Sequence, residues 1–269
     1  MGKAIAVGVA GLVISSAMLG LGFLAGTGGA TATSSPAPLA LERSQQLHRE
    51  SVEAIVYDFL ISNPEVMLDV QAALEARERE TRTAAARNAI TQQSDEIFNA
   101  ALDGIIGNPE GDVTIVEFFD YNCGFCKRAM ADMDAVIAAD PNVRFVLKEF
   151  PILGPDSQAA HVVSKAFNSL HPERYGDFHR DLMSVDGRAD EAAAIRIALE
   201  HGADEGELRE AMQDPALSDA FERTYTLANR LSITGTPSYV IGEDVVFGAQ
   251  GASVLFDKME DARSAAQVN

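Results

Sequence analysis

The chain has 269 residues and carries 40 acidic against 21 basic side chains, a formal net charge of −19. This shortage of Lys and Arg excludes a general nucleic-acid binder, which must neutralise phosphates, and the hydrophobic fraction of 47% is that of a globular protein. The two cysteines lie three positions apart, which excludes a multi-disulfide scaffold and a four-cysteine zinc site.

The first 32 residues have the pattern of an export segment. Lys3 is the only side-chain charge before Glu42, an apolar run follows from residue 4 to 26, and Ala30-Thr31-Ala32 fits a cleavage site. The run is also long enough for an uncleaved membrane anchor. We expect residues 1–32 to be a signal peptide or an anchor, with the rest exported to the periplasm. Residues 33–41 read as a short linker.

Residues 42–107 are rich in Ala, Glu, Arg and Gln, which predicts helices. Asn63-Pro64 divides the segment, because Asn suits a helix N-cap and Pro the first helical position. The apolar stripe of the second helix is thin, so this helix needs a partner surface. Packing on the downstream domain is one explanation. Self-association is the other, and we interpret residues 42–107 as an oligomerisation region.

Both cysteines lie where a strand is predicted to end and a helix to begin. Residues 113–119 form a nearly continuous apolar run, Cys123-Gly124-Phe125-Cys126 follows, and residues 143–150 predict a second buried strand. A C-x-x-C inside a βαβ unit is typical of a redox motif. The helix N-terminus stabilises a thiolate at Cys123, and Cys126 lies one turn inside the helix. We therefore expect Cys123 to attack and Cys126 to resolve.

Three other interpretations compete for the cysteine pair. A structural disulfide would close so short a loop that it would constrain the unfolded chain little. A metal site needs further ligands, and two thiolates alone suit a soft ion such as Cu(I). The five histidines lack ligand-like spacing and read as ordinary surface or helix residues: His48, His161, His171, His179 and His201.

A late Gly235-Thr236-Pro237 precedes a predicted hairpin strand, and proline is tolerated at a strand start. Taken alone, an X–Pro bond is expected to be trans. However, a strand ending in Glu-Phe-Phe, then C-x-x-C on a helix, then Gly-Thr-Pro before a hairpin resembles the DsbA-like branch of the thioredoxin superfamily over about residues 108–265. The front section resembles ScsC-type (suppressor of copper sensitivity) proteins. The fold class implied is α/β: thioredoxin-like, with a helical insertion and a preceding α-helical segment.

The resemblance implies several site residues. Pro237 should be cis and should form, with Thr236, a wall that pairs with an extended client segment. We expect Gly124 and Phe125 to contact the client as well. Glu117 and Lys148 interrupt buried runs on adjacent strands. Either they pair beneath Cys126 and move its proton, which we favour, or each reaches solvent at a strand end.

Residues 152–232 are too many for a loop and carry four helical patterns, so we expect a helical insertion over the redox centre. The patterns cover residues 157–170, 173–185, 189–200 and 216–231.

The sequence thus predicts an exported thiol–disulfide oxidoreductase that forms mixed disulfides with cysteine-containing client proteins. No organic cofactor and no metal is implied, because the cysteines carry the electrons. We favour an isomerase or reductase over an oxidase, since several sites in one oligomer can hold and reshuffle one client. The ScsC resemblance implies a membrane partner that keeps the cysteines reduced. A periplasmic copper carrier is the alternative from another class, and an inert scaffold fits poorly with an intact motif.

Overall fold

A computed structural model describes residues 37–268, with side chains described for residues 48–267. The predicted signal peptide or anchor at residues 1–32 lies outside this range. Within the described residues, no helix is both long enough and apolar enough to cross a bilayer. The chain divides into two compact units, residues 1–67 and 68–269.

The described part of the first unit is dominated by α1 (Ala37–Ser62). This helix starts inside the predicted linker, so residues 37–41 are helical and the predicted linker end is wrong. The physical reason is that Ala and Leu are strong helix formers and that a proline is tolerated in a first turn. Asn63 and Pro64 then separate α1 from α2 (Glu65–Gln92), as the sequence predicts.

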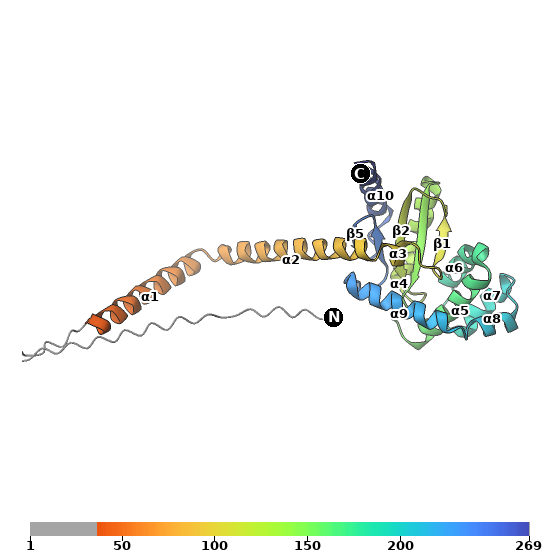
Figure 1. Cartoon of the computed structure of the whole chain (residues 1–269), viewed down its shortest axis with the longest axis horizontal. Helices are drawn as coiled ribbons and strands as arrows, with labels where there is room; N and C mark the ends of the chain where they lie inside the picture. The colour runs from red at the N-terminus through yellow and green to blue at the C-terminus, as the bar shows by residue number, and fades with distance from the viewer. Residues whose placement is uncertain (1–36, 269) are drawn as a thin grey trace, which may run out of the picture. The chain divides into compact units, whose positions relative to one another are not determined.

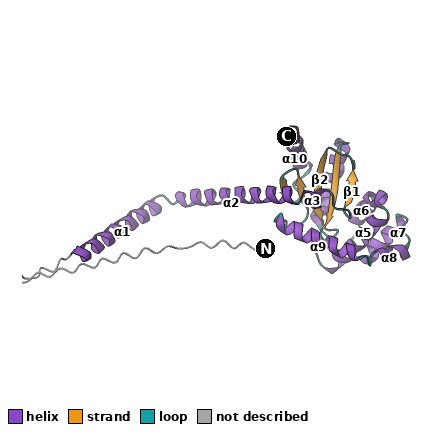
Figure 2. Cartoon of the chain, viewed as in Figure 1, coloured by secondary structure: helices purple, strands orange, loops and turns teal. Residues whose placement is uncertain are grey.

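The second unit is built on one five-stranded sheet of order β1-β3-β2-β4-β5 (Figures 1 and 2). The central strands β2 and β3 are parallel and the three other pairings are antiparallel. The strands are β1 (Gly104–Gly107), β2 (Val113–Phe119), β3 (Val143–Glu149), β4 (Ser238–Ile241) and β5 (Asp244–Phe247).

The folded domain begins earlier than its predicted start at residue 108. Strand β1 lies before that boundary and pairs with β3, and the side chains of Ile90 and Ile97 are buried in the same core as the sheet. The last turn of α2 and all of α3 (Ser94–Phe98) therefore belong to the domain. A boundary at residue 108 would expose this apolar surface and remove an edge strand.

Two apolar cores cover the two faces of the sheet. One includes Ile115 and Leu147 and is covered by α4 (Gly124–Ala139) and α10 (Ala252–Val268). The other includes Val116 and Val146 and is covered by α3 and by α9 (Pro215–Arg230). The alternation of side chains along β2 and β3 decides which residue reaches which core. We call these the α4 face and the α9 face.

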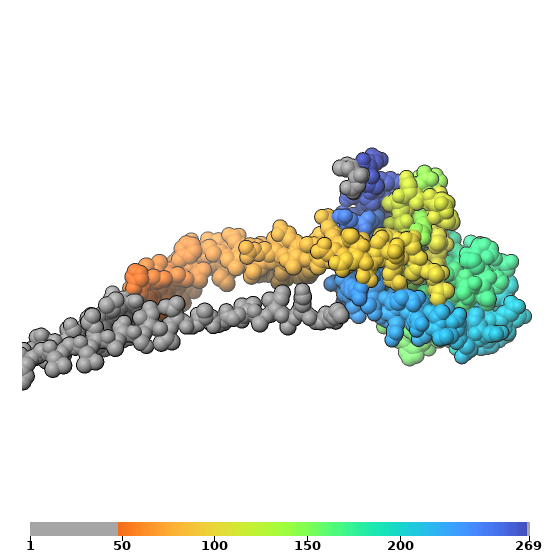
Figure 3. Space-filling model, in the orientation of Figure 1, coloured from red at the N-terminus to blue at the C-terminus, as the bar shows by residue number. Residues whose placement is uncertain are grey.

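The helical insertion follows β3, as expected. It contains the four predicted helices and one more, α8, whose seven residues are too few to show a helical period (Figure 1). Figure 3 shows the residues of α6, α7 and α8, in teal to cyan, gathered at one end of this unit. Besides α9, the helices are α5 (Pro155–Leu170), a 3-10 turn (Pro172–Arg174), α6 (Tyr175–Met183), α7 (Glu191–Glu200) and α8 (Glu205–Ala211).

Candidate active site

The two cysteines occupy the turn between β2 and α4. Cys123 is the residue before the helix, in extended conformation, and Cys126 lies within the first helical turn. Both are free thiols. Cys126 is fully buried, whereas 7% of Cys123 is exposed. Only the first cysteine therefore presents its sulfur to a partner molecule.

Their environments push the two thiols in opposite directions. The Cys126 thiol, the Thr236 side chain and the backbone N–H groups of Cys126 and Phe125 hydrogen-bond to the Cys123 sulfur and lower its pKa to about 5, although burial opposes them. Burial raises the pKa of Cys126 far above its usual value, and its hydrogen bond to Cys123 adds to this. At neutral pH the pair is thus one thiolate and one protonated thiol.

The bond between Thr236 and Pro237 is cis, as the family resemblance implied. The Cys123 sulfur lies 3.2 Å from the Thr236 carbonyl oxygen, to which the thiol donates when it is protonated. The Pro237 carbonyl accepts from Gly248 N–H at 2.9 Å, which fixes the loop on its other side. The cis-proline loop therefore lies directly against the nucleophile.

Glu117 lies on the α4 face, in register with Tyr239 of β4, and is 3% exposed. Burial raises its pKa to about 8, and the charges of Cys123 and Asp132 raise it too, while a hydrogen bond from Tyr239 opposes them. Its charge in turn contributes to the raised pKa of Cys126. A carboxyl near the buried thiol therefore changes protonation close to neutral pH.

The predicted pairing of Glu117 with Lys148 is wrong. Lys148 is in register with Phe118, one residue along, so its side chain lies on the α9 face. There its ammonium donates to the Asp103 carboxylate and to the Glu96 backbone carbonyl. Lys148 is fully buried and does not reach solvent at a strand end either. Its partners make it part of the domain's support, on the side away from the cysteines.

The two residues between the cysteines differ in what they present. Phe125 is 59% exposed, and the Arg128 guanidinium carbon lies 4.3 Å from its ring centre. A methyl group at Gly124 would meet only Arg128 Nη1, at 3.8 Å. The site thus offers an open backbone at Gly124 and an exposed aromatic ring at the next residue.

A buried polar network next to the cysteines was not predicted. Within it the Glu149 carboxylate accepts from His161 Nδ1 at 2.8 Å and from Ser164 Oγ at 2.7 Å, and Tyr175 Oη lies 3.3 Å away. His161 and His179 are helical, as expected, but they are fully buried rather than ordinary surface residues. A signal was present, because both lie among small or apolar helix positions.

Asp120 was missed as well. Its carboxylate is fully buried and accepts four hydrogen bonds, from Asn122 N–H, Ser157 Oγ, Ile152 N–H and Leu153 N–H, all between 2.8 and 3.0 Å. A charged residue placed between an apolar strand and a redox motif is the signal that points to it.

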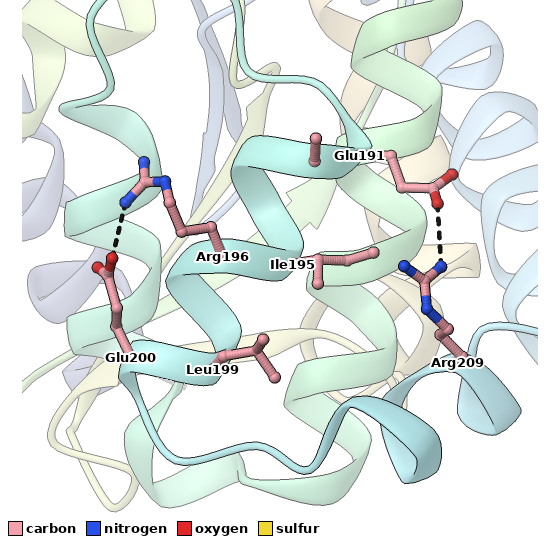
Figure 4. A pocket seen from close by; sticks show the side chains of 7 residues that line it. Glu191, Ile195, Arg196, Leu199, Glu200 and Arg209 are labelled. Atoms are coloured by element: carbon pink, nitrogen blue, oxygen red, sulfur yellow. Dashed lines mark hydrogen bonds and ion pairs between the residues drawn. The ribbon is translucent and has the colours of Figure 1, made fainter.

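A hollow in the insertion lies elsewhere, on the surface of α7 and α8 (Figure 4). Its floor is Ile195 and Leu199, and its rim carries the ion pairs Arg196–Glu200 and Arg209–Glu191. It includes neither cysteine nor the cis-proline loop, so it is a separate feature. Within the described residues, no three His, Cys, Asp or Glu side chains gather as metal ligands would.

Comparison with known protein families shows which domains this chain matches. Residues 114–260 match the DSBA-like thioredoxin domain, and residues 49–80 match the copper resistance protein ScsC N-terminal domain. The first match covers more than half of the chain and contains the cysteines, the cis-proline and the insertion.

Solved structures agree in fold. A thioredoxin-like oxidoreductase from Silicibacter pomeroyi is 42% identical over 63% of this chain and 97% of its own, with a TM-score of 0.60. The thiol-disulfide exchange protein α-DsbA2 from Wolbachia pipientis is 28% identical, covering 67% and 97%, with a TM-score of 0.62. Proteus mirabilis ScsC in a transitional conformation is 25% identical, covering 82% and 99%, with a TM-score of 0.60.

A curated relative is larger than this chain. The Na(+)/H(+) antiporter NhaA 3 of Salinispora tropica is 22% identical over 139 residues, which is 52% of this chain and 21% of the antiporter. The chain spans about a fifth of the length of that relative.

A fully buried thiol behind a thiolate that is only slightly exposed, facing a cis-proline at the end of a mixed sheet, defines a thioredoxin-like oxidoreductase, and the predicted fold class is confirmed. The chain belongs to the family of DsbA-like thioredoxin-domain proteins, with an ScsC-type N-terminal region, and is a thiol–disulfide oxidoreductase.

Proposed function

We propose that this protein is an exported disulfide isomerase or reductase that acts on client proteins as an oligomer. Exchange chemistry follows from the family, and one observation carries the choice of direction. The second half of α1 exposes a stripe of large apolar side chains at helical spacing: Val52, Ile55, Val56 and Phe59. Such a stripe needs a partner surface, and a second copy of the chain provides one.

The first step uses Cys123 as the nucleophile. Its thiolate attacks one sulfur of a client disulfide, a mixed disulfide forms, and the other client sulfur leaves as a thiolate that takes up a proton. With a pKa near 5, nearly all of Cys123 is ionised at neutral pH. The low pKa also stabilises the reduced form, which an isomerase needs before it meets a client.

The mixed disulfide then has two outcomes. Another client thiolate attacks the client sulfur of the mixed disulfide, which rearranges the client and restores the Cys123 thiolate. Alternatively, Cys126 gives its proton to the Glu117 carboxylate and attacks the Cys123 sulfur. The client leaves as a thiol, and Cys123–Cys126 becomes a disulfide that needs two electrons to be reduced. Glu117 suits this role because its pKa of about 8 keeps both of its forms populated.

The client is held by backbone and by apolar contact. An extended segment can pair with the backbone at Thr236 and Pro237, next to the sulfur, and pack on the Gly124–Phe125 turn. Main-chain pairing reads little sequence, which suits a protein that acts on many cysteine-containing clients.

The reduced resting state implies a redox partner. A membrane redox protein would supply the electrons, and an export segment at residues 1–32 would bring the chain to the same compartment. Assembly through α1 would place several Cys123 sites around one client, so that release from one site is followed by capture at the next.

The experiment is reactivation of a scrambled disulfide protein by the pre-reduced chain from Thr33 onward. Two variants add the same charge at adjacent exposed positions of α1: Ile55→Asp, in the apolar stripe, and Ala54→Asp, on the other side of the helix. The parent and Ala54→Asp should be oligomeric and active. Ile55→Asp should be monomeric and should lose reactivation while still reducing a small disulfide.

Two results would contradict the proposal. Equal reactivation by Ile55→Asp and by the parent would show that assembly is not needed. Failure of the reduced parent, combined with rapid oxidation of a reduced client by its oxidised form, would identify an oxidase instead.

A further inference from the structure

Three consecutive residues before Cys123 each bind the helical insertion through their side chains. Asp120 is the first, and it holds both the turn and the start of the insertion. One oxygen accepts from Asn122 N–H and Ser157 Oγ, and the other accepts from the N–H groups of Ile152 and Leu153. The turn carrying the nucleophile and the loop that opens the insertion thus share one buried carboxylate.

Tyr121 is the second. Its backbone N–H donates to His161 Nε2 at 3.2 Å, and its hydroxyl lies 2.7 Å from Ser164 Oγ and 3.2 Å from His179 Nδ1. These three partners belong to α5 and α6, and Glu149 anchors two of them. The side chain of Tyr121 is fully buried, so it cannot change its partners without opening the insertion.

Asn122 is the third, and it is adjacent to the nucleophile. Its Oδ1 accepts from Ala189 N–H at 2.8 Å, and its Nδ2 donates to the Ala189 carbonyl at 2.8 Å. Nδ2 also lies 2.9 Å from Ser157 Oγ. Both ends of one amide therefore pair with the backbone of a residue 67 positions later, in the loop before α7.

This use of Asn122 is not the local one. An Asn beside a helix start usually bonds to the backbone of its own helix, yet here the amide is committed to the insertion, and α4 begins without a side-chain cap. The turn itself is short, with Cys123 N–H donating to the Asp120 carbonyl at 2.9 Å. Any shift of Asn122 is therefore transmitted directly to the Cys123 backbone.

We propose that Asn122 is a positioning residue of thiol–disulfide exchange, which holds Cys123 against the Thr236 carbonyl by fixing the turn to the backbone of Ala189. This inference rests on the proposed exchange at Cys123 and extends it: the insertion supports the nucleophile as well as covering it. Without the amide pair, the turn keeps its connection to β2 and α4 but loses its tie to the loop before α7.

The test compares Asn122→Ala with Asn108→Ala in the full chain. Asn108 is a matched control because its amide also bonds to backbone at both ends, to the Pro141 carbonyl and to Glu110 N–H. It lies at the opposite end of β2 and β3 from the cysteines, since its N–H donates to the carbonyl of Val143, the first residue of β3. Both changes remove the same group and should cost similar stability.

The readout is the pH dependence of alkylation of Cys123 by iodoacetamide, which follows the thiolate and needs no client. In the parent and in Asn108→Ala the rate should be half-maximal near pH 5. In Asn122→Ala the N–H donors are less well aligned with the sulfur, and the midpoint should rise by about one pKa unit, which is tenfold in the ionisation equilibrium. Turnover of a protein client should fall with it.

Unfolding of each variant by urea separates stability from positioning. If the pH midpoint of Cys123 alkylation in Asn122→Ala equals that in Asn108→Ala, the inference is overturned, even where urea shows that both variants are destabilised. If Asn122→Ala does not fold, Asn122→Ser decides, because the shorter side chain keeps a polar group at this position but cannot pair with both backbone groups of Ala189. An unchanged alkylation midpoint in that second variant overturns the inference. A rise of the alkylation midpoint, even below one pKa unit, supports it. A parent that alkylates near pH 5 but exchanges no disulfide would refute the proposed function instead.

Discussion

Glu117 and Lys148 are matched opposites on the two faces of the sheet. Each interrupts an apolar strand, each is at most 3% exposed, and they lie on neighbouring parallel strands. The register pairs Glu117 with Leu147 and Lys148 with Phe118, so an offset of one residue sends them to opposite faces.

The difference lies in what surrounds each charge. Lys148 meets Asp103, whose charge opposes the lowering of the Lys148 pKa by burial. Glu117 meets the charges of Cys123 and Asp132, which act with burial to raise its pKa. A buried charge with an opposite partner joins structural elements, whereas a buried carboxyl among like charges is ready to exchange a proton. The α9 face thus supports the fold and the α4 face carries the chemistry.

The largest expected effect is on the α4 face. Cys123→Ser should reduce disulfide exchange to background, because it removes the only cysteine that is ionised at neutral pH and accessible to a client. Cys126→Ser should keep the attack and lose the resolution, so clients accumulate on Cys123. Non-reducing electrophoresis with mass spectrometry detects these adducts. Adducts formed equally well by Cys123→Ser would show that the assigned roles are wrong.

The next largest effect is expected from a substitution on the α9 face. Lys148→Met leaves the Asp103 carboxyl buried with Lys165 Nζ at 3.7 Å as its remaining cation, and should reduce the free energy of unfolding by about 3–5 kcal/mol. Urea denaturation measures this. The alkylation midpoint of Cys123 should not change, because Lys148 lies on the other face.

A double variant provides the control for that result. Adding Asp103→Asn to Lys148→Met removes the buried carboxyl that has lost its nearer cation and should restore part of the stability. No recovery would mean that the lysine stabilises the domain through the Glu96 carbonyl instead. A shifted Cys123 midpoint in either variant would contradict the separation of the two faces.

Glu117→Gln should produce an intermediate effect that depends on pH. The unfolded chain releases this proton near pH 4.5, whereas the folded reduced protein keeps it until about pH 8. The folded state thus binds more protons in this window, and stability falls as the pH rises through it. Glu117→Gln should remove most of that fall, at most about 5 kcal/mol by linkage.

Urea midpoints of parent and variant at pH 5 and pH 8.5 test this. Cys123 acts in the opposite sense, because its pKa is lowered to about 5 in the folded state, so stability rises with pH above that value. Comparing variant and parent at the same pH largely cancels that contribution. Turnover should also slow, by about 10²-fold for a lost proton acceptor. If the urea midpoints of the two proteins change with pH in parallel and their turnover is equal, Glu117 has no role in the mechanism.

The smallest effect concerns a helix that covers the α9 face. Asp214 caps α9 by accepting from Ala216 N–H at 2.8 Å. Asp214→Ala should lower the free energy of unfolding by about 1 kcal/mol and leave alkylation of Cys123 unchanged. A loss of stability near 3 kcal/mol would show that α9 depends on this cap more than on its buried face.

Local patterns in the sequence were enough to predict the frame of the site. The C-x-x-C at a strand end, the strands around Glu117 and Lys148, and four of the insertion helices follow from periodicity and turn residues. The cis bond at Pro237 followed only from the family resemblance, because X–Pro bonds in general are trans.

Three kinds of feature could not be predicted from the sequence: the face of the sheet on which a strand residue lies, a very short strand, and contacts between residues far apart in the chain. Strands buried on both faces show no alternation, so the sequence gives no face for Lys148. Strand β1 is four residues with two glycines, which hides its pattern. The partners of Asn122 and Asp120 in the insertion lie 30 to 70 residues away, and no local pattern reports such contacts.

The triplet Asp120-Tyr121-Asn122 also limits how this protein can be recombined. The insertion looks like a cassette between two strands, and exchanging it with that of a relative is an obvious way to graft client preference. Yet the acceptors and donors that receive the insertion are encoded outside it, just before Cys123. A chimera has to carry the triplet that matches its insertion, so the insertion and the turn have to be exchanged together.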